Sequence, residues 1–344
     1  MKTIILSAPT GKCRIMIGER LANAGKYVKG RNVAIITDSN VRKYYDKFFP
    51  ECDSVIEIGL GEENKTLKTV ERVWRRFLAL EMERPSFVLG IGGGIVCDIT
   101  GYAASNYLRG LDFGFVATTL LAQADAAIGG KNGFNFMGYK NIIGTVRQPK
   151  FCICDTSVLK TLPEAEVRCG FAEIIKSAAI GDAALFALLG SERREALRLD
   201  ENVMERVIES CATLKAGIVG RDESEAYERM KLNFGHTFGH AIEKTAKMPH
   251  GYAVAAGMAV AARLSVAKGM VGNAEAGRLL NLIRAFGLPT ECGMDAKGLV
   301  DAIRKDKKRR GNKVRMVLLE GIGKATITDV TIDEIADAMK EMAR

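Results

Sequence analysis

The sequence of 344 residues contains only three histidines, so their spacing is informative. His236 and His240 lie four residues apart in the segment KLNFGHTFGHAIEK, and His250 follows ten residues after His240. In a continuous helix, spacings of 4, 3 and 4 would put Arg229 and Asn233 on the same face as the first two histidines. Two histidines four residues apart on a helix can chelate a metal. On spacing alone, His236 and His240 are the first candidate ligand pair.

A second segment, GFAEIIKSAAIG, carries Glu173 and Lys176 one helical turn apart. Such a pair on a helix is usually solvated and contributes little to stability. Here the flanking residues are apolar on almost every side, so we expect both charges to be buried. Buried charges need partners, and a metal ion is one candidate. A carboxylate with two imidazoles and an open position forms a zinc site suited to polarising a hydroxyl group.

A glycine turn, Gly92-Gly93-Gly94, follows an apolar strand and opens a helix. Glycines at such a place let backbone N–H groups approach a pyrophosphate at the positive end of the helix. The spacing is not GxGxxG, and glycine turns between strand and helix are common, so a nucleotide site and a plain turn both stay open. Asp38, at the end of an earlier strand, could bind a ribose, although a helix N-cap is the more usual role.

Two other segments bring cations together. The segment 120–144 holds Asp125, Lys131, Lys140 and Asn141 among glycines, which fits either an anion site or an ordinary surface loop. The run 304–315 has eight Lys or Arg residues without interleaved aromatics. Nucleic-acid binding would favour such aromatics, so we expect no nucleic-acid partner.

The first part of the chain alternates strand-like and helix-like segments, which predicts parallel βαβ units. Strands are expected in 32–40, at the start of 86–105, in 113–121 and in 150–159, with a helix over 64–82. Beyond residue 160 helices dominate, at 164–180, 183–197, 201–218, 225–247, 251–270, 274–286 and 296–306. We therefore expect an α/β fold with a Rossmann-like domain over 1–158 and a mostly α-helical domain over 159–344.

Composition excludes several classes of protein. Hydrophobic residues make up 47% and charged residues 26%, which are ordinary globular values. No apolar run is long enough to span a membrane, and the N-terminus lacks the apolar core of a signal peptide, so a cytoplasmic protein without a membrane partner is expected. Eight scattered cysteines without a CxxC pair predict buried thiols. The formal charge of +9 permits an anionic substrate but does not select one.

Taken together, these segments resemble the 3-dehydroquinate synthases of the sugar-phosphate cyclase family, from about residue 33 to 325. No single motif decides this; their order and spacing do. The motifs are TDSNV (37–41), GEENK (61–65), GGGIVCDITGYAA (92–104), RG (109–110), TTLLAQAD (118–125), GGK (129–131), KN (140–141), LKTLP (159–163), GFAEIIK (170–176), LNFGHTFGHAIE (232–243), HGYAVAAGM (250–258), DKK (306–308) and VLLEGIG (317–323).

The resemblance implies NAD and a divalent metal, usually zinc with cobalt as an alternative. It gives the metal to Glu173, His236 and His250, and moves His240 to the substrate side. The implied NAD-binding residues are Asp38, Asn40, Glu62, Lys65, Gly93, Gly94, Ile95, Asp98, Thr118, Thr119, Leu121, Lys131, Lys140 and Thr161. The implied substrate-site residues are Arg109, Asp125, Lys131, Lys140, Asn141, Lys176, Lys215, Arg229, Asn233, His240 and Lys307.

The implied reaction is a carbon–oxygen lyase step of the shikimate pathway, which leads to chorismate and the aromatic amino acids. The anionic substrate, 3-deoxy-D-arabino-heptulosonate 7-phosphate, would become 3-dehydroquinate and phosphate. The implied order is transient NAD-dependent oxidation, phosphate elimination, re-reduction and intramolecular aldol closure. The resemblance also implies a homodimer, in which Arg109 would reach the neighbouring subunit's site.

The sequence departs from the family pattern near the implied sites. Tyr252 stands where Glu is usual, Ala126 and Ala127 where serines are common, and Asn132 where Thr is frequent. These departures leave open another sugar-phosphate cyclase, making an inosose or a valiolone. A metal-dependent polyol dehydrogenase is a further alternative, but it would have no use for so many phosphate-binding cations.

Overall fold

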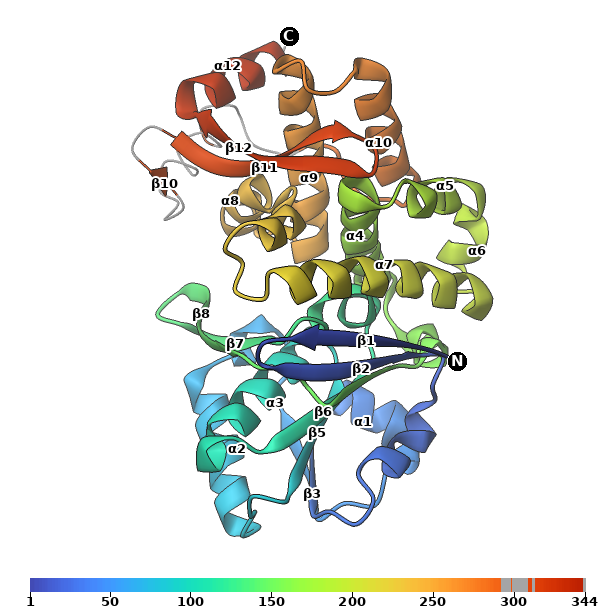
Figure 1. The fold of residues 1–344 in the computed structure, drawn as a ribbon, viewed down its shortest axis with the longest axis vertical. Helices are drawn as coiled ribbons and strands as arrows, with labels where there is room; N and C mark the ends of the chain where they lie inside the picture. The colour runs from blue at the N-terminus through green and yellow to red at the C-terminus, as the bar shows by residue number, and fades with distance from the viewer. Residues whose placement is uncertain (292–297, 299–308, 311–312, 343–344) are drawn as a thin grey trace. The chain divides into compact units, whose positions relative to one another are not determined.

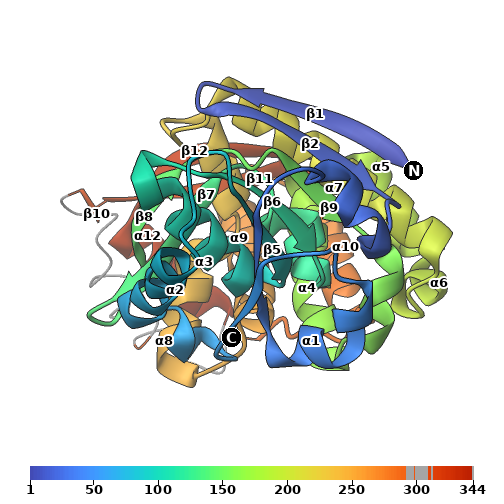
Figure 2. The ribbon, with the colours of Figure 1, turned by 90° about the horizontal axis from the view of Figure 1, so that it is seen from below.

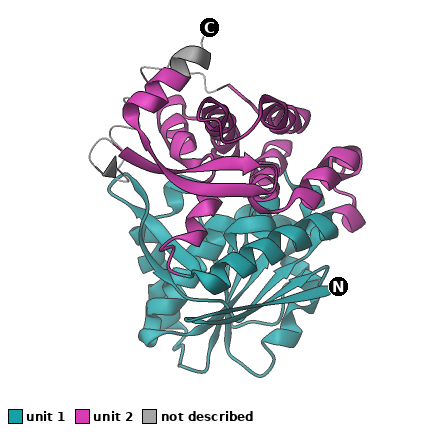
Figure 3. Cartoon of the chain, turned by 45° about the horizontal axis from the view of Figure 1, so that its top comes forward, with its two compact units in different colours: residues 1–163, 204–223 teal, residues 164–203, 224–344 magenta. Residues whose placement is uncertain are grey.

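The computed structural model describes residues 1–291, 298, 309–310 and 313–342. Its internal contacts divide the chain into two compact units (Figure 3). Unit 1 comprises Met1–Pro163 and Met204–Glu223, and unit 2 comprises Glu164–Val203 and Ser224–Arg344. The chain therefore leaves unit 1 after residue 163, forms the first part of unit 2, and returns to unit 1 over residues 204–223.

Unit 1 is built on a seven-stranded sheet with the order β1-β2-β9-β6-β5-β3-β4 (Figure 1). Only the β1–β2 pair is antiparallel within it. The strands are β1 (Lys2–Ala8), β2 (Gly11–Ile17), β3 (Val33–Asp38), β4 (Ser54–Ile58), β5 (Phe87–Gly92), β6 (Asp112–Ala117) and β9 (Phe151–Cys154). The helices are α1 (Ser39–Tyr45), α2 (Leu67–Ala79) and α3 (Gly94–Asn106), with a hairpin of β7 (Lys131–Phe136) and β8 (Tyr139–Val146).

The sheet is covered on both faces, which explains the unbroken apolar runs of its central strands. Every residue of β5 is buried, as are Val33–Thr37 of β3. On one face, Ile35 and Leu89 pack with Leu21 of a 3-10 helix (Leu21–Tyr27) and Val41 of α1. Helix α3 packs on the other side of β5, with α2 next to it (Figure 2). Gly90 permits that approach, because a Cβ there would lie 2.7 Å from Thr100 Oγ1 of α3.

Unit 2 is mostly helical. Its helices are α4 (Glu164–Gly181), α5 (Ala183–Ser191), α6 (Arg193–Leu197), α8 (His236–Ala246), α9 (His250–Ala267), α10 (Asn273–Ala285) and α12 (Ile332–Met342). Helix α7 (Glu201–Arg221) begins in this unit and contributes most of its length to unit 1. Helices α4 and α9 form the core, with thirteen buried residues each. The α/β class, with a Rossmann-like sheet and a mostly helical second part, is confirmed.

Three pairs of strands, together with β4 and β10, were missed in the sequence. Strands β1 and β2 extend the sheet of unit 1, and the segment interpreted as a loop contains the β7–β8 hairpin. In unit 2, β11 (Lys313–Gly321) pairs with β12 (Lys324–Thr331), and β10 (Arg309–Arg310) pairs with β11. The hairpin has a polar, glycine-containing sequence with no clear alternation of apolar residues, so its strand character depends on pairing. The helix expected at 296–306 lies outside the described residues except for position 298.

The helix expected over 225–247 is interrupted. A 3-10 helix (Glu228–Asn233) ends before Phe234, and α8 begins at His236. Gly235 lies between them with φ +79°, a left-handed conformation that a continuous helix cannot contain. The expectation of one helical face carrying Arg229, Asn233, His236 and His240 is therefore wrong, although α8 does carry both histidines.

The seven described cysteines are free thiols. Six are buried, as predicted, and Cys52 is partly exposed. Among the described residues no helix has the length and apolar character required to cross a membrane.

Candidate metal centre and nucleotide site

Three side chains from three helices of unit 2 form a cluster of metal-binding groups. Glu173 lies on α4, His236 opens α8 and His250 opens α9. One ligand atom from each lies within 4.8 Å of the others. The Nε2 atom of His250 is 3.4 Å from Glu173 Oε1, and Nε2 of His236 is 3.7 Å from the same oxygen. The donor set of one carboxylate and two imidazoles suits zinc or a similar divalent ion.

Burial and neighbouring charges prepare these groups differently. Burial alone would raise the pKa of Glu173, but Lys176 and the two histidines hold it well below its usual range. Burial lowers the pKa of His236 to about 3, so this ring is neutral at pH 7. For His250, the carboxylates of Glu173 and Glu243 outweigh burial and raise the pKa to about 9. The cluster thus offers an ionised carboxylate, a neutral imidazole and an imidazole that must lose a proton before it binds a metal.

Glu173 and Lys176 are buried together, as the apolar flanks predict. Their side chains are 2% and 1% exposed, and Lys176 Nζ lies 2.5 Å from Glu173 Oε2. No hydrogen bond of good geometry reaches either oxygen of Glu173 in the described residues. Lys176 pairs with Oε2, whereas Oε1 faces the two imidazoles, and a buried anionic oxygen in that position is stabilised by a cation placed between it and the rings. This observation, together with the donor set, fits a bound metal ion.

Glycines let the three ligand-bearing helices approach one another. A Cβ at Gly257 of α9 would lie 2.1 Å from the carbonyl oxygen of Gly235 and 2.7 Å from the amide nitrogen of Gly239, both next to or within α8. At Gly251, a Cβ would lie 2.3 Å from Cys169 Cα of α4. These positions tolerate no side chain because the opposing atoms are backbone. The spacing of the helix axes, and with it the ligand geometry, therefore depends on glycine.

Glu243 and His240 lie beside the cluster, and Asn233 and Arg229 lie in the 3-10 helix that precedes α8. His250 Nδ1 lies 3.4 Å from Glu243 Oε2, on the opposite edge of the ring from Glu173. The ring of His240 is centred 5.5 Å from that of His236, outside the metal-binding group of three. Asn233 donates to Glu225 Oε1 at 2.5 Å, and Arg229 is 2% exposed. Spacing alone favoured His236 with His240, whereas the structure groups His236 with His250 and Glu173, the three residues that the resemblance implies.

In unit 1, the glycine turn lies where the strand order reverses. The chain passes from β3 to β4 on one side and from β5 to β6 on the other, so the carboxyl ends of β3 and β5 flank a switch point. Nucleotides bind at such points in open α/β sheets. Gly93 precedes α3 without a side-chain cap, and a Cβ there would lie 2.8 Å from Thr119 Cγ2. Thr118 Oγ1, at the end of β6, is buried and lacks a hydrogen-bond partner in the described residues.

Asp38 is the N-cap of α1, accepting from the amide of Val41 at 3.0 Å, as its usual role predicts. The other oxygen of its carboxylate is not used by that cap. Burial raises the pKa of Asp38. Other residues implied for NAD follow the carboxyl ends of the strands: Asn40 lies in α1 after β3, Ile95 in the first turn of α3 after β5, and Leu121 after β6. Thr161 ends the 3-10 helix after β9, and its Oγ1 is 2.8 Å from Tyr45 Oη.

The loop after β4 is tied to the β7–β8 hairpin. Lys65 is 4% exposed, forms an ion pair with Asp98 and donates to Asn141 Oδ1 at 2.6 Å. Burial raises the pKa of Asp98, although Lys65 opposes that shift. Glu62 accepts from Asn135 Nδ2 at 2.8 Å. The structure therefore brings Glu62, Lys65, Asp98 and Asn141 into one network.

The lysines implied for the substrate are placed differently from one another. Lys215 donates to the carbonyl oxygen of Asp125 at 2.7 Å and forms an ion pair with its carboxylate. Lys131 begins β7, whereas Lys140 lies beside the turn of the hairpin, roughly 13 Å further along the strands. Both are exposed, as is Arg109, and Lys307 lies outside the described residues.

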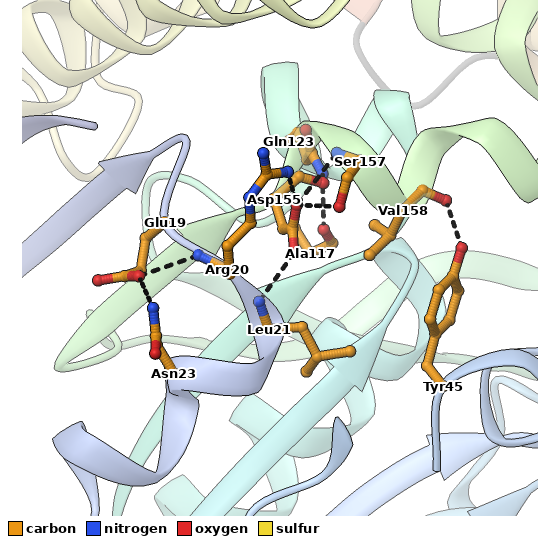
Figure 4. A network of polar contacts seen from close by, with 10 residues as sticks. All are labelled: Glu19, Arg20, Leu21, Asn23, Tyr45, Ala117, Gln123, Asp155, Ser157 and Val158. Carbon is orange, nitrogen blue, oxygen red and sulfur yellow. Dashed lines mark hydrogen bonds and ion pairs between the residues drawn. The ribbon is translucent and has the colours of Figure 1, made fainter. Parts of the chain in front are cut away.

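A further polar network holds the chain where β9 ends (Figure 4). The carboxylate of Asp155 accepts from the amide nitrogens of Leu21 at 2.8 Å and Ser157 at 3.0 Å, and from Arg20 at 3.1 Å. The side chain of Gln123 donates to the carbonyl oxygens of Ala117 and Asp155. These bonds fix the carboxyl ends of β6 and β9 relative to the start of the following segments.

Comparison with known proteins identifies the family. The model of the 3-dehydroquinate synthase N-terminal domain matches residues 55–169, and that of the C-terminal domain matches 170–309. The chain belongs to the 3-dehydroquinate synthase family. A curated 3-dehydroquinate synthase from Dehalococcoides mccartyi is 38% identical, with 99% of this chain and 100% of that protein covered.

Two solved structures of other members of the superfamily are also similar. A 2-epi-5-epi-valiolone synthase from Streptomyces hygroscopicus, with NAD⁺ and Zn²⁺ bound, has a TM-score of 0.87 at 30% identity, over 96% of each chain. A 2-deoxy-scyllo-inosose synthase complexed with carbaglucose-6-phosphate, NAD⁺ and Co²⁺ has a TM-score of 0.86 at 25% identity, covering 99% of this chain and 100% of that one.

One departure from the 3-dehydroquinate synthase pattern has a structural explanation. Asn132 is 5% exposed, and its amide donates to the carbonyl oxygens of Gly130 at 2.7 Å and Arg147 at 3.1 Å. A Cβ at Gly101 of α3 would lie 1.8 Å from Asn132 Oδ1, so the pair packs only with glycine on the helix. Asn132 therefore serves the packing of the hairpin on α3 and has no side-chain atom left for a ligand beyond that oxygen.

Sequence reasoning missed Asn135, Glu225 and Glu243, which contact Glu62, Asn233 and His250 respectively. Glu243 lies seven residues after His236, two helical turns further along α8. A search for carboxylates at helical spacing from the histidines would have found it. Asn135 and Glu225 had no such spacing signal, because turns in the chain bring them to Glu62 and Asn233.

Proposed function

We propose that this chain is a 3-dehydroquinate synthase, a carbon–oxygen lyase that converts 3-deoxy-D-arabino-heptulosonate 7-phosphate to 3-dehydroquinate and phosphate. The observation that carries the proposal is the 38% identity to a curated enzyme of that name over essentially the whole of both chains. The cluster of Glu173, His236 and His250, which matches the family's implied metal ligands, supports it.

The residues present fit both groups that the family implies. Glu173, His236 and His250 would hold a divalent metal, zinc or cobalt. The turn Gly93-Gly94 and the start of α3 would hold the pyrophosphate of NAD, with Asp38 facing the ribose. When bound, the metal supplies Lewis acidity to a substrate hydroxyl, and NAD supplies a reversible hydride acceptor.

The chain's own groups prepare the site for that chemistry. Lys176 keeps Glu173 ionised, which preserves a full negative charge among the ligands. Burial keeps His236 neutral, so its ring nitrogen is available as a donor. Asp125 and Lys176 would orient the ring hydroxyls of the substrate, and Asp125 is itself held by Lys215.

Cationic and amide side chains would bind the two anionic ends of the substrate. Lys131, Lys140, Asn141 and His240 are assigned to the phosphate, where positive charge stabilises the leaving group. Arg229, Lys215 and Lys307 are assigned to the carboxylate. The departing phosphate can take the proton released in the elimination, so no protein general base is assigned. Holding one flexible substrate through every step fits catalysis by orientation.

The test is phosphate release from 3-deoxy-D-arabino-heptulosonate 7-phosphate in the presence of zinc and trace NAD⁺, with NADH absorbance followed in parallel. We expect phosphate in large excess over the NAD⁺ supplied, without accumulation of NADH. Absence of phosphate release from protein shown to bind zinc and NAD⁺ would refute the proposal. Release from sedoheptulose 7-phosphate or glucose 6-phosphate instead would identify a different cyclase, the alternative suggested by the two solved structures.

We also propose that the enzyme is a homodimer in which Arg109 serves the neighbouring subunit's site. Its exposure and the positive φ of +65° suit a side chain presented outward from a tight turn. Light scattering should give twice the mass of the chain. Mixing Arg109→Ala protein with an inactive Glu173→Gln variant should restore activity, because one of the two mixed sites would be intact.

A further inference from the structure

The side chain of Asn135 joins two segments that the proposed function uses for different ligands. Its Nδ2 donates to Glu62 Oε1 at 2.8 Å, and its Oδ1 accepts from the amide nitrogen of Asn141 at 2.9 Å. Its own amide nitrogen donates to the carbonyl oxygen of Lys65 at 2.8 Å. A single residue therefore bonds to the loop after β4 and to the far strand of the hairpin.

These bonds close a ring of contacts. Lys65 Nζ reaches back to Asn141 Oδ1 at 2.6 Å and pairs with Asp98 of α3. Thr66 and Asn135 form an isolated parallel bridge at the same point. Asn135 and Lys65 thus link the loop to the hairpin and to α3 through polar contacts, in addition to the packing of the hairpin on α3.

The hairpin is irregular where Asn135 contacts it. Asn141 has φ +50°, a left-handed conformation that asparagine adopts more readily than most other residues. A register shift separates the Phe134–Ile143 pair from the Phe136–Tyr139 pair, so Asn135 itself has no regular ladder partner in β8. The bond from the Asn141 amide to Asn135 Oδ1 replaces the missing ladder bond.

We infer that Asn135 is a positioning residue, which holds Glu62, Lys65 and Asn141 in one arrangement for ligand binding. The inference rests on the proposed function and on the family resemblance, which implies Glu62 and Lys65 for NAD and Asn141 for the substrate. Asn135 itself needs no contact with either ligand. Its two side-chain bonds use a donor and an acceptor in fixed places, so an amide fits and a carboxylate of the same size does not.

Two variants of the full-length protein separate this role from simple packing. Asn135→Ala removes both side-chain bonds. Asn135→Asp keeps the size and the acceptor but places a second carboxylate against Glu62. A packing role predicts that the isosteric Asp variant is the milder, whereas a positioning role predicts that it is at least as severe as Ala. Met137→Asn is the matched control, since Met137 is 83% exposed at the hairpin turn and has a φ of +48° that Asn tolerates.

Hydrogen exchange of the ligand-free protein gives the first readout. The amide of Asn141 should exchange about tenfold faster or more in Asn135→Ala, since it loses its acceptor, and the control should match the wild type. Calorimetry of NAD⁺ binding gives the second. We expect Kd to rise about tenfold in Asn135→Ala, by at least as much in Asn135→Asp, and by less than twofold in the control.

Wild-type exchange at Asn141 in both variants would overturn the inference, as would NAD⁺ binding within twofold of the wild type in both. A mild Asp variant beside a severe Ala variant would also overturn it, in favour of packing. Failure of the wild-type protein to bind NAD⁺ would refute the proposed function separately, because hydrogen exchange does not depend on the ligand.

Discussion

Replacing Gly257 with alanine should disturb the metal centre without touching a ligand. The new Cβ would lie 2.1 Å from the carbonyl oxygen of Gly235, whereas ordinary contact begins at 3.4 Å. The shortfall is 1.3 Å (3.4 minus 2.1). Both neighbours, Gly235 and the amide nitrogen of Gly239, are backbone atoms that cannot rotate away. Helices α8 and α9 must therefore move apart by about that distance or shear past each other.

The movement separates two ligands. His236 follows Gly235 directly, and His250 opens the helix that carries Gly257. Metal–ligand distances tolerate about 0.2 Å, so a displacement several times larger should weaken zinc binding at least tenfold. Overpacking of this kind costs about 1–3 kcal/mol of unfolding free energy. The gain in helix propensity from glycine to alanine, about 1 kcal/mol, offsets only part of it.

Gly277→Ala in α10 is the matched control. A Cβ at Gly277 meets nothing within 4 Å, so the same chemical change should stabilise the protein by about 0.5–1 kcal/mol. Urea denaturation of the metal-free proteins measures both free energies, and competition with a chromogenic chelator measures zinc affinity. The reasoning would be refuted by a Gly257→Ala protein that unfolds at the wild-type urea concentration and binds zinc as tightly as the wild type.

Three other changes test the remaining electrostatics. In Glu173→Gln, the buried ammonium of Lys176 loses its counter-charge. Urea unfolding of the metal-free protein should therefore show a loss of about 3–5 kcal/mol in unfolding free energy, and zinc should no longer bind. Unchanged stability would contradict a buried ion pair between the two residues. Because the pKa of His250 is raised to about 9, its ring carries a proton at pH 7 that zinc must displace. Zinc affinity should therefore rise about tenfold per pH unit between pH 6 and 8, whereas a flat profile would mean that the ring is already neutral. Asp155→Ala leaves two backbone N–H groups without their acceptor and should cost about 2–4 kcal/mol in thermal or urea unfolding, while Asp155→Asn should cost less.

Much of the α/β architecture follows from local sequence. The buried strands β3, β5, β6 and β9 are short apolar runs bounded by turn residues, and they match the predicted segments except that β6 begins one residue earlier. Helix α2 repeats its apolar residues at helical spacing. Such elements are readable because burial on one or both faces dictates the residue type at each position.

Other elements depend on partners distant in the sequence. The β7–β8 hairpin carries lysines and asparagines, and becomes strand only by pairing and by its bonds to the loop at Glu62. The helix expected over 225–247 is broken at Gly235, where the close approach of α9 requires the backbone to turn. Local propensity cannot predict either feature, because the contact that decides it is made with residues distant in the sequence.

For the metal centre too, the sequence predicted one part and the tertiary structure decided the other. Residue types determined the chemistry: three histidines and a carboxylate in an apolar helix are the materials of a zinc site. Spacing on one helix favoured His236 with His240, since a linear pattern registers only neighbours four residues apart. The tertiary structure instead groups His236 with His250 and with Glu173, which lies 63 residues earlier than His236. Only the glycine contacts that bring α4, α8 and α9 together decide this, because they set which ring nitrogens meet the buried carboxylate.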